Sequence, residues 1–210
     1  MLREGIPDPG PAPPPADDLR RACAGDPDGL VRLVERFTPL VRAAARYRLG
    51  GELRRLHDPD ALVPDVWARV LPRLAELAER GEPDAGELLR LLSRALLARL
   101  RALLKRRLWP GVQAGADLAE EPATLPAAVG AALRRALGPA PEDSVLAAIE
   151  HLSGRERRLF LMRGFERASA RDVALILDEE PAEVERSYAH LLAGLRQRVP
   201  GAVFDAIDAG

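Results

Sequence analysis

The chain has 210 residues with a formal net charge of −1, of which 47% are apolar but only 4% aromatic. The core must therefore consist mainly of Leu, Ala and Val, which favours helices over sheets. No apolar run approaches the ~20 residues of a membrane span, and Cys23 is the only cysteine, so no internal disulfide can form. We predict an all-α, cytoplasmic protein without a membrane contact, and we expect Cys23 to be a small buried side chain.

The first half of the chain is predicted to be a tail followed by a helical domain. Residues 1–16 are rich in proline, which is typical of a disordered segment. Apolar residues then recur at helical spacing through a domain that we place at 17–110. Its four expected helices cover about 18–25, 27–49, 58–77 and 87–108.

The second half is predicted to be a linker followed by a smaller helical domain. Residues 111–140 are rich in Ala, Pro and Gly and are interpreted as a flexible linker, with one short helix at 125–137. The second domain is placed at 141–200 and a tail at 201–210. Helices are expected there at 142–151 and 154–163, ahead of a helix-turn-helix.

The segment at 168–199 has the pattern of that helix-turn-helix. Apolar residues keep helical spacing on both sides of a four-residue break at 178–181. Ser169 is a candidate N-cap of the first helix, and Pro181 stands where the start of a helix tolerates proline. Because a helix-turn-helix places its second helix in the major groove, this segment predicts DNA as a partner.

The helix expected at 87–108 has a basic face. Residues 88–107 contain seven basic side chains and no acidic one, with leucines on the opposite face. The basic residues are Arg90, Arg94, Arg99, Arg101, Lys105, Arg106 and Arg107. Such a helix suits contact with DNA phosphate, although a solvated basic face that offsets the helix dipole is the alternative. Residues 16–108 carry 19 basic against 14 acidic side chains, whereas 140–210 carry 9 against 13, which also points to the first half.

No arrangement typical of an enzyme is found. His57, His151 and His190 fall in different predicted elements, and no Cys/His spacing suits a metal. A glycine-rich phosphate loop, a paired-carboxylate constellation and a Ser/His/Asp set are likewise lacking in the sequence. We therefore expect no catalytic residue, no metal, no cofactor and no small-molecule substrate.

Four segments, in order and at matching spacing, resemble the motifs of one protein family. They are AGDPDGLVRLVERF at 24–37, DALVPDVWARVL at 60–71, LSGRERRLF at 152–160 and the helix-turn-helix at 168–199. Over about residues 18–199 the chain resembles an extracytoplasmic-function (ECF) sigma factor of bacterial RNA polymerase. The resemblance implies two helical modules on a flexible linker, with core RNA polymerase and promoter DNA as partners, and it allows an anti-sigma factor as a third.

The resemblance also implies roles for individual residues. The helix at 58–77 would bind polymerase, through Asp60, Asp65, Trp67 and Arg69. The helix at 87–108 would engage and melt the downstream promoter element through its seven basic residues. The helix-turn-helix would read the upstream element, through Ser169, Arg171, Arg186, Ser187, His190 and Arg196.

Several positions depart from the family pattern and support an alternative. Leu91 and Ala98 stand at or near the positions of the Trp and Asn that the family commonly uses near melted DNA, although Trp109 could supply a ring. Four acidic residues crowd the start of the reading helix, namely Glu179, Glu180, Glu183 and Glu185. The alternative is a sigma-derived adaptor that binds polymerase or another protein but has weakened promoter recognition or melting. A plain helix-turn-helix regulator, acting as a dimer without polymerase, is a third hypothesis.

Overall fold

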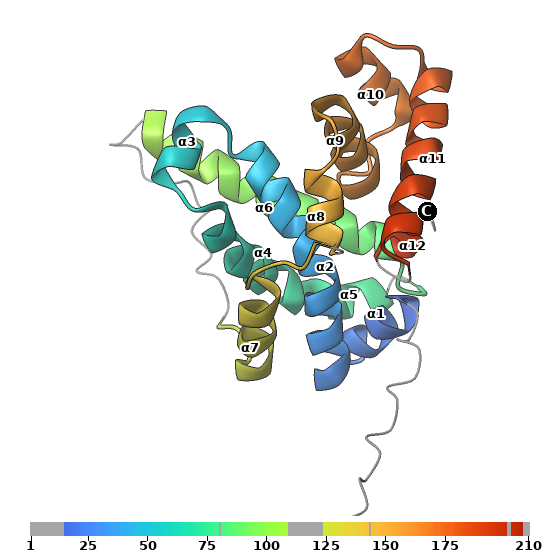
Figure 1. Ribbon diagram of the computed structural model, residues 1–210. Helices are drawn as coiled ribbons and strands as arrows, with labels where there is room; N and C mark the ends of the chain where they lie inside the picture. The colour runs from blue at the N-terminus through green and yellow to red at the C-terminus, as the bar shows by residue number, and fades with distance from the viewer. Residues whose placement is uncertain (1–14, 80, 109–123, 143, 201–202, 208–210) are drawn as a thin grey trace, which may run out of the picture.

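The computed structural model describes residues 15–79, 81–108, 124–142, 144–200 and 203–207 (Figure 1). Within these ranges every regular element is a helix, which confirms the all-α prediction. The α-helices are α1 Pro15–Cys23, α2 Pro27–Arg48, α3 Gly51–Leu56, α4 Leu62–Val70, α5 Leu74–Glu79, α6 Ala85–Leu108, α7 Ala127–Ala136, α8 Val145–Glu150, α9 Gly154–Phe160, α10 Ala170–Leu177, α11 Pro181–Arg198 and α12 Phe204–Ile207. Short 3-10 turns, η1 Pro59–Ala61 and η2 Leu71–Arg73, and a π-helical turn, η4 Leu161–Phe165, complete the list. Most of the predicted tail (1–14), Trp109 and residues 111–123 of the predicted linker lie outside the described residues.

Helix α2 lies at the centre of the fold and contacts α1, α4, α6, α7 and α8. Its start has clear local causes, because the Asp26 side chain caps the helix by accepting from the Asp28 N–H and Pro27 occupies the first turn. Apolar side chains recur every three or four residues and are fully buried, as Leu33, Phe37 and Leu40 illustrate. The expected buried position of Cys23 is also confirmed, and burial raises the pKa of its thiol.

The single helix predicted at 58–77 is wrong, because this stretch is broken into η1, α4, η2 and α5. Pro72 lacks the N–H that a continuous α-helix needs, and the chain passes it in the 3-10 turn η2. Pro64 does not interrupt α4, since it lies in the first turn, where that N–H has no helical partner.

The part of the predicted linker that the structure describes is packed against the first domain. The short helix predicted at 125–137 is confirmed as α7, whose buried Val129 and Leu133 lie on the side that packs against α2. Arg135 forms an ion pair of 2.6 Å with Glu35 of α2. Residues 124–140 therefore belong to the folded body rather than to a flexible connection.

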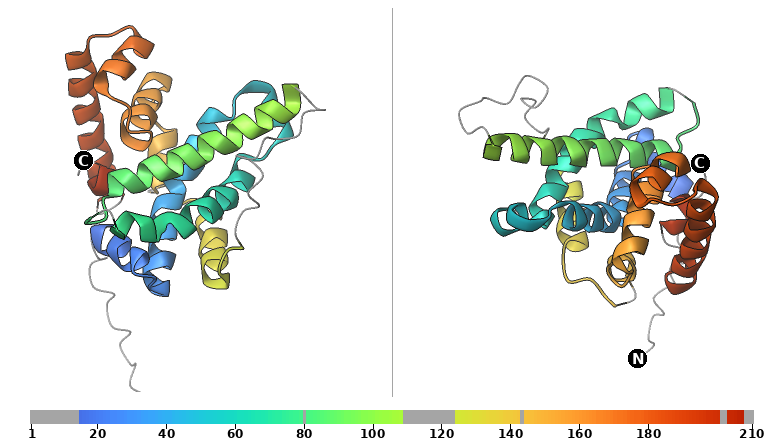
Figure 2. Two further views of the ribbon diagram at one scale, coloured as in Figure 1. Left: turned by 180° about the vertical axis from the view of Figure 1, so that it is seen from behind. Right: turned by 90° about the horizontal axis from the view of Figure 1, so that it is seen from above.

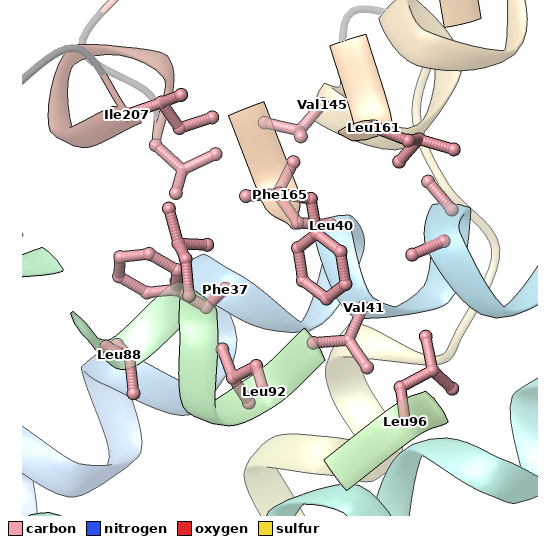
Figure 3. Close-up of a cluster of buried hydrophobic side chains, with 14 of the residues drawn as sticks. Phe37, Leu40, Val41, Leu88, Leu92, Leu96, Val145, Leu161, Phe165 and Ile207 are labelled. Atoms are coloured by element: carbon pink, nitrogen blue, oxygen red, sulfur yellow. The ribbon is translucent and has the colours of Figure 1, made fainter. Parts of the chain in front are cut away.

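The two predicted domains share one hydrophobic core (Figure 3). The cluster joins Phe37, Leu40 and Val41 of α2 to Leu88, Leu92 and Leu96 of α6, and to Val145, Leu161, Phe165 and Ile207 from the second half of the chain. The prediction of two separate modules is therefore not confirmed within the described residues. Burial of apolar surface, rather than a linker, holds the two halves together.

The predicted tail at 201–210 contains a buried helix, α12. Phe204 is fully buried and its ring meets that of Phe160 edge to face, with centroids 5.8 Å apart. Helix α12 also contacts α6 and α11. The end of the chain thus fastens the helix-turn-helix to the first domain.

Candidate nucleic-acid interface

Helix α6 has the two faces that its sequence predicts. Leu88, Leu92 and Leu96 are buried, and the helix packs against α4 and α2. It begins beside α12 and runs away from the body of the fold, so its C-terminal part projects at one end of the molecule (Figure 2). A 24-residue helix rich in Leu, Ala and Arg needs little support from tertiary contacts along its outer face.

The outer face of α6 carries cations that no acidic residue of the described ranges neutralises. Arg90, Arg94 and Arg101 are exposed, follow one another at intervals of four and seven residues, and form no ion pair among the described residues. Arg106 is exposed and unpaired in the same sense, and Lys105 is half-buried. These side chains form a line of positive charge that matches a polyanion. We call the line Arg90, Arg94, Arg101 the α6 basic face.

Arg99 does not belong to this face. It is half-buried, and its Nε lies 2.8 Å from Oδ2 of Asp65 on α4. The prediction that Arg99 contacts DNA and Asp65 contacts polymerase is corrected, because the two groups neutralise each other inside the fold. Arg107, the last of the seven basic residues, is exposed at the C-terminal end of α6.

Asp60, predicted to bind polymerase, is tied down within the protein. Its carboxylate accepts hydrogen bonds from Arg42, at 2.9 and 2.7 Å, and from Arg46, at 3.2 and 3.1 Å. Burial alone would raise the pKa of Asp60, but the hydrogen bonds from the two guanidinium groups outweigh it and hold the pKa below its usual value. Asp60 therefore joins η1 to α2 and is not available to a partner.

Trp67 is likewise part of the core. Its side chain is fully buried, and its indole N–H donates to Oγ1 of Thr38 at 3.0 Å. A residue without accessible surface cannot contact polymerase, so the prediction that Trp67 does so is corrected, and Trp67 is a core residue. Of the four residues predicted to bind polymerase, Asp65 and Arg69 lie on α4 and are partly exposed.

The predicted helix-turn-helix is present as α10 and α11. Ser169 caps α10 by accepting from the Asp172 N–H, as its sequence position predicts. The turn bends through Asp178, whose left-handed φ of 58° is a conformation that Asp tolerates better than most residues. Helix α11 then starts at Pro181, and Val184 is fully buried in the body of the fold.

The glutamates at the start of α11 are mostly neutralised by arginines of the same module. Glu179 accepts two hydrogen bonds from Arg155, at 2.7 and 2.6 Å. Glu185 lies 2.9 Å from Arg163, whose guanidinium also stacks over the Tyr188 ring. Glu183 forms an ion pair with Arg186 on the next turn. Glu180 forms no ion pair among the described residues.

Of the residues of this module that were predicted to contact DNA, some are exposed and others have contacts within the protein. Arg171 and His190 are exposed, and Arg171 has no ion-pair partner in the described parts of the chain. Arg186 is exposed but paired, Ser169 is used as a cap, and Ser187 lies 3.5 Å from a nitrogen of Arg155. Arg196 is corrected to a structural residue, since it lies 3.3 Å from Asp205 beside α12.

Two exposed apolar residues on α10 were not expected. Leu175 is 78% exposed and Ile176 is 61% exposed, next to Asp178 in the turn. The sequence signal was present, because five consecutive apolar residues at 173–177 exceed what one buried face of a helix can use. This surface lies away from the C-terminal end of α6, on the opposite side of the molecule (Figure 1).

No protein-family model, curated protein or solved structure matches this chain. Within the described residues no cluster of three or more His, Cys, Asp or Glu could hold a metal ion. None of the described helices has the length and apolarity to cross a bilayer. The candidate site is therefore defined by its own geometry, which is the α6 basic face together with the helix-turn-helix.

Proposed function

We propose that the protein is a sigma-type subunit that binds core RNA polymerase and directs it to promoter DNA. The observation that carries the proposal is the α6 basic face, in which Arg90, Arg94 and Arg101 are exposed without a carboxylate partner in the described residues. Such cations supply the phosphate contacts that dominate DNA affinity. The helix-turn-helix and the resemblance over residues 18–199 support the same function.

In this proposal the polymerase contact is smaller than the resemblance implies. Asp60 and Trp67 serve the fold and Asp65 is paired with Arg99, so Pro64 and Arg69 are the partly exposed residues that α4 has left for this contact. Arg171 and His190 of the helix-turn-helix would contact DNA bases, while α6 would contact the phosphate backbone of the DNA.

The experiment compares DNA retention by core polymerase with and without the protein. Core polymerase plus the protein should retain a set of genomic promoter fragments that core alone does not. Replacing Arg90, Arg94 and Arg101 by alanine should weaken this retention strongly and reduce the magnitude of the negative slope of log affinity against log salt by about 3. Arg134→Ala is the matched control, because Arg134 is an exposed arginine on α7 that forms no ion pair with any described residue. Equal retention by both variants would contradict the proposal.

A second candidate is an adaptor whose helix-turn-helix binds a protein instead of DNA. Two observations favour it. Three arginines of this module are neutralised by glutamates, in the pairs Arg155–Glu179, Arg186–Glu183 and Arg163–Glu185. Leu175 and Ile176 on α10 are exposed apolar residues. The substitution Leu175→Ser with Ile176→Ser separates the two functions. Loss of polymerase binding with DNA retention of the isolated protein unchanged would favour the adaptor.

A further inference from the structure

A groove beside α3 is lined mostly by charged and polar side chains. It has a volume of about 540 Å³ and lies where α2, α3 and the turn before η1 meet. Its lining residues are Arg46, Arg54, Arg55, Leu56, His57, Asp58 and Pro59. None of these residues was singled out as a binding residue from the sequence.

The acidic groups around this groove already accept hydrogen bonds. The Asp60 carboxylate accepts from Arg42 and Arg46, and Asp58 Oδ1 accepts from the backbone N–H of Asp60 at 2.9 Å. Arg46 is further neutralised by Glu150, at 2.7 Å. The Asp60 carboxylate is thus matched by Arg42 and Arg46, whereas Asp58 is exposed, forms no ion pair within the described residues and leaves one negative charge at the groove.

Arg54 and Arg55 are the other cations of the groove. Both side chains are exposed, and neither forms an ion pair or hydrogen bond within the described residues. His57 is half-exposed beside them and adds ring nitrogens that can donate. Both arginines line the hollow, and each guanidinium group presents a fork of N–H donors, which is the chemistry that suits an oxyanion.

The groove lies at the same end of the molecule as the C-terminal part of α6. Helix α3 and the last turns of α6 lie at this end in all three views, on the side away from the helix-turn-helix (Figures 1 and 2). Lys105 and Arg106 are on those last turns of α6. The cations at the end of α6 and those of α3 therefore belong to the same end of the molecule.

We propose that the α3 groove binds a backbone phosphate of the same DNA that lies along α6. The inference rests on the proposed DNA contact of α6 and extends it to a second element. Arg54 and Arg55 would bind the phosphate, so both α3 and α6 would contact the DNA at this end of the protein. Phosphate contacts of this kind position the duplex without reading its sequence.

The test is the salt dependence of DNA binding by the full-length protein, measured by fluorescence anisotropy on a labelled duplex. The slope of log affinity against log salt is negative, and each lost phosphate contact reduces its magnitude by about 0.9. The double variant Arg54→Ala with Arg55→Ala should reduce the magnitude by about 2, and Arg54→Lys with Arg55→Lys should restore most of it. Arg134→Ala on α7 should leave the slope unchanged. An unchanged slope in the alanine variant, with its helical content and melting temperature intact, would overturn the inference.

The α6 variants distinguish a failure of this inference from a failure of the proposed function. If Arg90→Ala with Arg94→Ala reduces the magnitude of the slope and the α3 variant does not, the groove is no part of the DNA site while the proposed function stands. If neither variant changes DNA binding, the DNA contact of α6 has failed first, and the groove proposal falls with it.

Two further probes separate DNA from other sources of phosphate. Inorganic pyrophosphate at constant ionic strength should not raise the melting temperature of the protein; stabilisation that the alanine variant lacks would make the groove a small-anion site instead. Leu56 is 58% exposed and Leu108 is 62% exposed at this end, so vesicles containing phosphatidylserine are the second probe. Co-sedimentation with these vesicles that depends on Arg54 and Arg55 would overturn the DNA assignment.

Discussion

The carboxylate of Asp65 on α4 and the guanidinium of Arg99 on α6 form an ion pair, with 2.8 Å between Oδ2 and Nε. Both side chains are more than two-thirds buried. The pair removes one charge from the surface of each helix and fixes how α6 lies on α4. Arg99 therefore helps to hold the fold together, whereas the exposed Arg94 on the same helix faces solvent.

This contrast predicts different effects for two arginines five residues apart. Arg94→Ala should weaken DNA binding and reduce the magnitude of the salt slope by about 1, because Arg94 is exposed and has no ion-pair partner in the described parts of the chain. Arg99→Ala should leave the salt slope nearly unchanged and should instead destabilise the fold by about 1–3 kcal/mol, since Asp65 loses its partner. The two quantities are measured by anisotropy titrations and by urea unfolding. A larger effect of Arg99→Ala on the salt slope would contradict the assignment.

The Asp60 network predicts a stability loss. Asp60→Asn should lower the free energy of unfolding by about 1.5–3 kcal/mol at pH 7, because Arg42 remains buried without its carboxylate. Asp58→Asn is the matched control on the same turn. An asparagine can still cap η1 with its side-chain oxygen, so this variant should change stability little. Urea unfolding of both variants tests the prediction.

The same network predicts a pH dependence with a definite sign. The pKa of Asp60 is lower in the folded protein than in the unfolded chain, so its contribution to stability is full above the unfolded pKa of about 4. That contribution is lost as the pH falls through the lowered folded pKa. The stability difference between wild type and Asp60→Asn should therefore stay constant from pH 8 to pH 5 and shrink below about pH 4. A difference that grows in acid would exclude this explanation.

The ion pairs on α11 predict a gain of function. Glu183→Gln with Glu185→Gln frees Arg186 and Arg163, so DNA affinity should rise and the salt slope should steepen by about 1–2. Glu180→Gln removes one charge but frees no arginine, and its effect should be smaller. If the double variant binds promoter DNA less well, the carboxylates accept hydrogen bonds from bases, as an acidic side chain does from cytosine N4.

The buried position of Trp67 can be read by fluorescence. The chain has two tryptophans, so Trp109→Phe leaves Trp67 as the only one. Its emission should be blue-shifted and poorly quenched by iodide, both free and in the presence of core polymerase. Thr38→Val should then cost about 1–2 kcal/mol, because the indole N–H loses its acceptor. Strong quenching in the free protein would show that Trp67 is a surface residue after all.

Local sequence signals predicted the elements well because their causes are local. Ser169 and Ser153 cap the helices that follow them, and the capping box between Ser153 and Glu156 is complete. Leucine spacing placed α6 within two residues of its true start. These features depend on neighbours within four positions, which the sequence displays directly.

Partners that are distant in sequence could not be predicted in this way. The resemblance implies that Asp60 and Trp67 contact polymerase, yet their partners Arg42 and Thr38 come from α2, at least 18 residues earlier. Helix α12 was missed because Phe204 and Ile207 are too few to make a periodic pattern. The composition of residues 111–140 predicts a flexible linker around one short helix, although Val129 and Leu133 of that helix are buried in the core. The composition of a segment shows how much apolar surface it can bury, but it does not show which other element it will pack against.

Co-elution of the purified protein with core RNA polymerase on a sizing column is the decisive test of the sigma-type function. We expect a stable complex at moderate salt, and we expect the complex to retain promoter DNA through Arg90, Arg94 and Arg101. A folded, helical protein that elutes entirely apart from core polymerase would contradict the sigma-type function.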